Sequence, residues 1–169
     1  MSNNDLSVAS EGRSNVLPNE MRDLAQYDAM LMDISGISAM LGPFYMQGFL
    51  KAKDTASLYH SQAIRNYERC RDESKKLWAV AKLDKSFAAL REKGIVKPTE
   101  GDRECYADCD EDYLKMREAE AYWKSLSILL GVKVDTYQAA HDDAKKIYDK
   151  TEEPRGSSKG LPSTKERYE

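Results

Sequence analysis

The chain has 169 residues, 33% of them charged and nine of them glycine, a composition that favours one helical domain over a turn-rich β fold. Its formal net charge of −3 excludes nucleic-acid binding driven by overall charge, so such a function must rest on local charge. The first residues lack the apolar run of a secretory signal, and the cysteines Cys70, Cys105 and Cys109 are odd in number. Both features predict free thiols in the reducing cytoplasm.

Residues 34–50 carry no charge, which raises the question of a membrane span. The segment is shorter than the ~20 apolar residues that a span needs, and Gly36, Gly42, Pro43 and Gly48 interrupt it. We therefore expect buried protein surface here and no membrane contact.

The N-terminal part of the sequence predicts a flexible arm followed by a helix. Residues 1–17 are polar and aperiodic, as is typical of a mobile end. Apolar residues at three- and four-residue spacing then predict a helix over residues 19–41, with Asn19 as its cap and a possible break at Gly36. Gly42–Pro43 suits the end of one helix and the start of the next, because glycine is favoured after a helix and proline at its first turn.

Residues 44–93 form the longest segment with helical spacing. This segment contains one glycine and no proline, and many of its apolar positions are alanine, which allows close approach of a neighbouring helix. Residues 94–98 are expected to end the helix. Thr99 is then a cap, with Asp102 at the reciprocal position of a capping box. A short acidic segment follows, which we expect to be helical only in part.

A second long helix is predicted over residues 117–148, where one apolar stripe comprises Ala119, Tyr122, Leu126, Leu130, Val134, Tyr137, Ala140, Ala144 and Ile147. Gly131 marks a place for a bend or a close neighbour. Residues 151–169 are polar, with no such stripe, and are expected to be disordered.

The expected fold class is all-α: an elongated antiparallel hairpin of two long helices, with the N-terminal helix laid against one end. Residues 18–150 would form this single helical domain. A lone hairpin of such length leaves apolar surface in water, so the domain is predicted to self-associate into an oligomer.

Charge is distributed unevenly along the hairpin. Residues 65–93 contain nine basic against five acidic residues, a local charge of +4, whereas residues 100–120 contain three basic against nine acidic residues, a local charge of −6. One interpretation is a basic arm that follows a phosphate backbone, with Tyr67 and Trp78 close enough to stack on bases. The other is a solvated helix face that pairs with the acidic segment across the hairpin or between subunits.

Catalytic and metal-binding patterns are not found. His60 and His141 have no nucleophile motif beside them, and the spacing of Cys105 and Cys109 matches no common zinc pattern. Glycine-rich phosphate loops are also missing from the sequence. We expect a protein that is not an enzyme and holds neither metal nor cofactor.

A series of short patterns resembles phage recombination mediators of the UvsY type. The patterns are Thr99-Glu100, Asp112-Tyr113, the helix entry at residues 117–121, Tyr122-Trp123 and the apolar run at residues 126–130. A long helix rich in Tyr and Ala, with a basic second half, precedes them as it does in that family. The likeness covers about residues 24–148. The chain departs from the family in a longer charged tail and in Gly131.

The resemblance implies a cytoplasmic homo-oligomeric ring that binds single-stranded DNA. Such proteins help a RecA-like recombinase to displace a single-strand binding protein. The resemblance places the oligomer contacts on the C-terminal helix, at Tyr122, Trp123, Leu126, Leu129, Leu130, Val134 and Tyr137. It places the DNA contacts on the basic half of the preceding helix, although the basic residues there have no clear one-to-one match in the family. Our candidates for these contacts are Arg65, Arg69, Arg71, Lys75, Lys76, Lys82 and Lys85.

Two other functions fit the same sequence. A coiled-coil assembly or scaffolding protein would use the apolar stripes to bind other proteins, and would oligomerise without affinity for DNA. A small acidic inhibitor of a nucleic-acid enzyme would use Asp108, Asp110, Glu111 and Asp112 to imitate nucleic acid.

Overall fold

The computed structural model describes residues 19–152. The arm expected at residues 1–17 lies outside this range, as does the expected tail from residue 153 onward. The described residues form helices and connecting turns with no strand, which confirms the all-α class. The order of elements is α1 (Asn19–Met32), two 3-10 turns at Ile34–Gly36 and Ala39–Leu41, α2 (Gly42–Val80), a π-helical turn η5 (Ala81–Lys85), α3 (Ser86–Glu92), α4 (Glu100–Asp108) and α5 (Glu111–Glu152).

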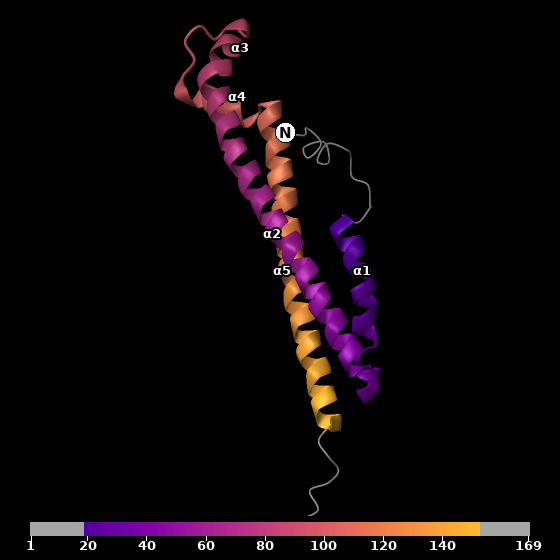
Figure 1. The fold of residues 1–169 in the computed structure, drawn as a ribbon. Helices are drawn as coiled ribbons and strands as arrows, with labels where there is room; N and C mark the ends of the chain where they lie inside the picture. Colours follow the sequence, from indigo (N-terminus) through magenta and orange to yellow (C-terminus); the bar gives the residue numbers. More distant parts are fainter. Residues whose placement is uncertain (1–18, 153–169) are drawn as a thin grey trace, which may run out of the picture.

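Two long helices, α2 and α5, pack against each other as an antiparallel hairpin, and α1 lies along the N-terminal part of α2 (Figure 1). The predicted long helix pair is therefore confirmed. The backbone stays helical through the π turn, with φ and ψ of −59° and −45° at Ala81 and −62° and −39° at Ser86. Residues 42–92 thus form one rod, as the spacing over residues 44–93 predicts.

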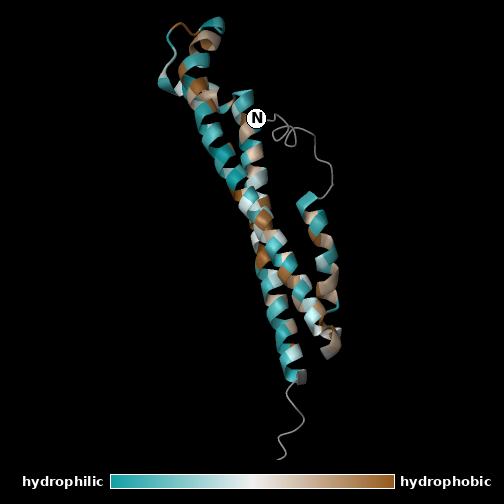
Figure 2. Ribbon diagram, viewed as in Figure 1, coloured by the Kyte–Doolittle hydropathy of each residue, from teal (hydrophilic) through white to brown (hydrophobic). Residues whose placement is uncertain are grey.

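The core lies where α1, α2 and α5 meet. Figure 2 shows hydrophobic residues along the middle of the hairpin, with others near the end at which α3 lies. The buried core comprises Leu24, Tyr27, Phe49, Ala52, Ala56, Ala63, Leu126, Leu130, Tyr137, Ala140 and Ala144. Full burial of a leucine or phenylalanine contributes about 1.5–3 kcal/mol, while the alanines of α2 let α5 approach closely.

Polar contacts fix α1 against α5. The carboxylate of Asp28 accepts hydrogen bonds from the Lys133 Nζ at 2.7 Å and from the Tyr137 hydroxyl at 2.8 Å. Burial and the Asp28 carboxylate together raise the pKa of Tyr137 above its ordinary value, because both disfavour a charged phenolate. A charge-assisted hydrogen bond of this kind stabilises by about 1.5–3 kcal/mol.

The prediction of one helix over residues 19–41 is wrong beyond Met32. The chain leaves the helix there and passes through two 3-10 turns before α2 begins, a break for which Gly36 supplies the weak helix propensity. Gly42 then starts α2, with Pro43 in its first turn. A Cβ at Gly42 would lie 3.0 Å from the Cβ of Tyr148, so glycine also lets the start of α2 approach the C-terminal part of α5.

The far end of the hairpin follows the predicted capping pattern. Gly94 ends the rod with a φ of +86°, and Thr99 forms the predicted capping box with Asp102. The acidic segment is more helical than expected, since α4 spans Glu100–Asp108. The last helix begins at Glu111 rather than near residue 117, because the Asp110 side chain accepts a hydrogen bond from the Tyr113 backbone amide and caps its first turn.

Candidate nucleic-acid and self-association surfaces

Potential metal ligands do not gather in the part of the chain that the structure describes. Among residues 19–152, no group of three or more His, Cys, Asp or Glu side chains could hold a metal ion. The three cysteines are free thiols, with Cys70 buried and the other two exposed. No helix within this range is long and apolar enough to cross a membrane. Absence of enzymatic activity stays a prediction.

The basic arm, defined here as Arg65, Arg69, Lys75 and Lys76, lies exposed along the second half of α2. Within the described residues, Arg65 and Arg69 form no ion pair. Lys75 and Lys76 have only acids of their own helix as partners, at 4.0 Å and 3.5 Å. Exposed pairs of this kind contribute at most ~1 kcal/mol, so the arm presents positive charge to solvent.

Arg71, also a candidate DNA contact, is partly withdrawn from that surface. Its guanidinium lies 5.7 Å from the ring centre of Tyr67. Its Nε is buried without a hydrogen-bond partner, and the nearest carboxylate oxygen, from Asp72, is 3.7 Å away. Tyr67 is thereby covered on one face, which leaves less of its ring for stacking on a base.

Lys82 lies in a different environment from the basic arm. Its Nζ is 2.7 Å from both Glu100 and Glu104 of α4, and its side chain is 15% exposed. The same Nζ lies 5.0 Å from the ring centre of Trp78, and the indole Nε1 of Trp78 donates to Asp108 at 2.8 Å. The hydrogen bonds that Lys82 donates to Glu100 and Glu104 raise the pKa of Lys82 above its ordinary value.

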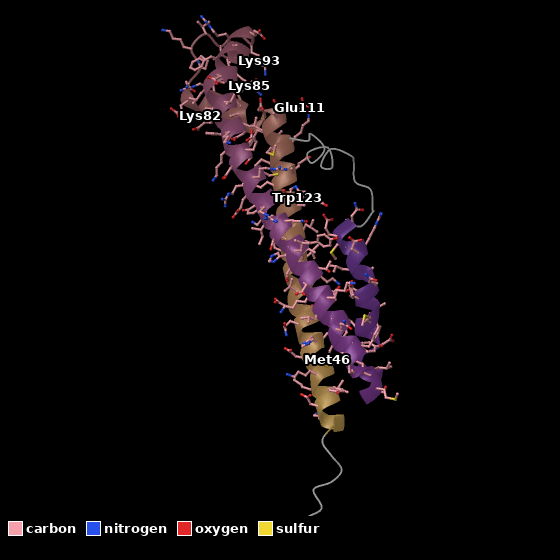
Figure 3. The ribbon with its side chains drawn as sticks, in the orientation of Figure 1. Met46, Lys82, Lys85, Lys93, Glu111 and Trp123 are labelled. Carbon is pink, nitrogen blue, oxygen red and sulfur yellow. The ribbon has the colours of Figure 1, made fainter. Side chains whose placement is uncertain are left out.

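Lys85 is neutralised in the same manner by carboxylates of the joint between α4 and α5 and of the first turn of α5. Its Nζ lies 2.9 Å from carboxylate oxygens of both Asp110 and Asp112. Hydrogen bonds to Asp112, and to a smaller extent to Asp110, raise the pKa of Lys85. The same hydrogen bond from Lys85 lowers the pKa of Asp112. Lys82 and Lys85 project from the end of the hairpin that is distant from Met46, with Trp123 between (Figure 3).

We call this set of contacts the charged clasp; it consists of Lys82, Lys85 and Trp78 with Glu100, Glu104, Asp108, Asp110 and Asp112. Pairing across the hairpin was the alternative to DNA binding for the basic helix. The structure contains that pairing at Lys82 and Lys85, whereas Arg65 and Arg69 remain outside it. The α4 residues that bind Lys82 and Trp78 were not identified from the sequence. The available signal is the four-residue spacing of Glu100, Glu104 and Asp108, which places the three acids on one face of a helix.

The residues assigned to oligomer contacts divide between two faces of α5. Leu126, Leu130 and Tyr137 are 3%, 0% and 0% exposed within the single chain, so their spacing is explained by packing on α1 and α2. Trp123 and Val134 pack against the same core. Tyr122 and Leu129 are 38% and 53% exposed and remain open to another molecule.

A second apolar face of α5, which the sequence analysis did not identify, surrounds Leu129. Ile128 and Val132 are 60% and 59% exposed; with Tyr122 and Leu129 they form what we call the outer stripe. The signal in the sequence is the width of the apolar run Leu126–Leu130, which is too broad for one stripe on a helix. Two successive leucines, Leu129 and Leu130, must point to different sides.

No protein-family model, curated protein or solved structure matches the chain.

Proposed function

We propose that the chain is a non-enzymatic, self-associating protein that binds single-stranded DNA. The observation that carries this proposal is the exposed basic arm, in which Arg65 and Arg69 have no carboxylate partner among the described residues. The resemblance to UvsY-type mediators extends the proposal to a role: helping a RecA-like recombinase to replace a single-strand binding protein on DNA.

Binding would be electrostatic and independent of base sequence. Each lysine or arginine that contacts a phosphate releases condensed counterions, so the affinity falls steeply with salt. Arg65 and Arg69 are one helical turn apart on α2, and Lys76 lies about two further turns along. A strand that follows the helix axis would meet them in succession.

Self-association would strengthen a surface that is modest in one chain. The outer stripe supports it, because Ile128, Leu129 and Val132 are all more than half exposed, and contiguous apolar surface of this kind typically marks an interaction site. Each added copy would bring another basic arm to the same strand, and linked weak sites raise the overall affinity strongly.

The test is the binding of fluorescein-labelled oligo-dT, measured by anisotropy between about 50 and 200 mM salt. The variant Arg65→Glu/Arg69→Glu should bind more weakly, and its salt slope should fall by about 1.4 because each lost phosphate contact removes about 0.7. The control Lys145→Glu/Lys150→Glu changes net charge equally at exposed positions of α5 outside the arm. Wild-type protein that binds no single strand at low salt would overturn the proposal.

A coiled-coil assembly protein is the second candidate, and the outer stripe favours it. This function requires oligomers but no affinity for DNA, so light scattering with and without oligo-dT separates the two. The acidic-inhibitor reading has less support, because Asp108, Asp110 and Asp112 are already bound by Trp78 and Lys85.

A further inference from the structure

We propose that α4 and the start of α5 form a removable anionic cover over a second nucleic-acid surface, and that single-stranded DNA displaces this cover. The hidden surface consists of Lys82, Lys85 and Trp78. This inference rests on the proposed function, since it supposes that the chain meets a single strand at all.

The cover imitates the charge pattern of a nucleic-acid backbone. Glu100, Glu104 and Asp108 lie at four-residue steps on one face of α4, about one helical turn apart. Two of these carboxylates are bound to Lys82 and the third to the indole of Trp78. A row of carboxylates thus binds the Lys82 ammonium and the Trp78 indole, which could otherwise bind a phosphate and a base.

Charge contacts and a small apolar contact hold the cover in place. Ala107 of α4 is buried, as are Ala81 and Leu90 of the rod, and all three lie outside the main core. The apolar residues buried at this contact are few and mostly alanine, so the hydrophobic free energy that opposes release is small compared with that of the three-helix core. The Arg103 guanidinium of α4 also lies 5.0 Å from the ring centre of Phe87, a residue that is 44% exposed. Exposed charge contacts weaken as salt or a competing polyanion is added.

Both ends of α4 are connected in ways that permit movement. On one side Gly94 adopts its positive φ, and the residues from there to Thr99 are not helical. On the other side the helix stops at Asp108, and a short break precedes α5 at Glu111. Release of the cover therefore requires changes at these junctions and in the first turn of α5, and the α2–α5 packing beyond that turn does not depend on it.

The hidden surface continues the basic arm along the same rod. Lys75 and Trp78 are three residues apart and Lys82 follows Trp78 by four, a spacing that puts them on one side of the rod, and Lys85 lies with Lys82 in the π turn that extends α2. Local π turns are frequent at functional sites. A strand that passes Lys75 of the exposed arm would reach these groups next, with phosphates for the lysines and a base for the indole face.

The first test removes the two carboxylates that bind Lys82, in the variant Glu100→Gln/Glu104→Gln. We expect oligo-dT affinity to rise on the order of tenfold, as for one charge-assisted contact, and the salt slope to steepen by about 0.7. The control Glu111→Gln/Glu118→Gln removes two exposed negative charges near the same end without touching Lys82. It should give a smaller gain and an unchanged slope.

A second substitution assigns the gain to Lys82. In the Glu100→Gln/Glu104→Gln background, Lys82→Gln should abolish the added affinity and the added slope. In the wild-type background the same change should have a smaller effect. Equal effects in the two backgrounds would overturn the inference. Circular dichroism of each variant shows whether the hairpin is folded, so a misfolded variant is not mistaken for a weak binder.

Hydrogen exchange on the wild-type protein measures displacement directly. Oligo-dT should accelerate amide exchange in residues 100–108 while leaving the core segments of α2 and α5 protected. The proposed cover alone would be overturned if wild type binds oligo-dT while exchange in residues 100–108 is unchanged or slower, and if Glu100→Gln/Glu104→Gln and Glu111→Gln/Glu118→Gln bind with the same affinity. Absence of oligo-dT binding by wild type and by Glu100→Gln/Glu104→Gln would overturn the proposed function as well. Binding by the variant alone would show a cover that DNA does not displace, and would overturn both the displacement and the proposed function of the wild-type protein.

Discussion

Two neighbouring leucines of α5 offer a direct comparison between the core and the outer stripe. Leu130 is 0% exposed and Leu129 is 53% exposed. Leu130→Ala removes side-chain volume from the core formed by α1, α2 and α5, and such changes cost about 2.7–5.0 kcal/mol when the cavity persists. Leu129→Ala removes the same atoms from a surface, where the free energy of unfolding should change by less than about 0.5 kcal/mol.

Urea denaturation followed by circular dichroism measures both effects. With a slope of about 1.5 kcal/mol per M, a loss of about 3 kcal/mol lowers the midpoint for Leu130→Ala by about 2 M. The midpoint for Leu129→Ala should stay within about 0.3 M of wild type.

Measurements at several protein concentrations separate protomer stability from association. By light scattering, Leu129→Ala should shift the oligomer toward smaller species, while folded Leu130→Ala should retain it. Equal losses of unfolding free energy for the two variants at low concentration would refute the assignment of the two faces.

Three further predictions follow from single contacts. Tyr137→Phe should lower the free energy of unfolding by about 1.5–3 kcal/mol, because the hydrogen bond to Asp28 is lost. Folding raises the pKa of Tyr137 above its ordinary value of 10.0, so the wild-type protein loses this stabilisation as the pH rises past that value. The difference between the urea midpoints of wild type and Tyr137→Phe should therefore shrink there. Gly131→Ala should stabilise the protein by about 0.5–1 kcal/mol because alanine favours a helix over glycine, and the new Cβ fits 3.4 Å from His60. Gly42→Ala should destabilise it, because the new Cβ would lie only 3.0 Å from Tyr148. Thermal melts of the two variants test both expectations. Hydrogen bonds from Lys82 and Lys85 lower the pKa values of Glu100 and Asp112 below their ordinary values of 4.5 and 3.8. The docking of α4 and of the first turn of α5 should therefore be stable above these ordinary values and should weaken as the pH falls below them. Amide chemical shifts of residues 100–112, followed through a pH titration, measure the change.

The sequence predicted the helices better than it predicted what their faces contact. Spacing located the rod of residues 42–92 and the stripe of α5, and Thr99 located the start of α4, because these signals are local. Whether Leu126 packs within one chain or between chains depends on the position of α1, which no local pattern records. The partners of Lys82 were missed for the same reason: Glu100 and Glu104 approach it only after the chain reverses at Gly94.

Different interactions hold the two ends of the hairpin, and this difference bears on how the molecule could respond to a ligand. At the end covered by α1, Leu24, Phe49 and Tyr137 are buried, and apolar burial of this kind is insensitive to screening by salt. At the end that carries α4, Lys82 and Lys85 bind the exposed carboxylates of Glu100 and Asp112, and such pairs weaken when other ions compete. A polyanion should therefore loosen α4 without disturbing the three-helix core. That separation is what a chain needs if it is to bind a strand at one end while the rest of the molecule stays folded.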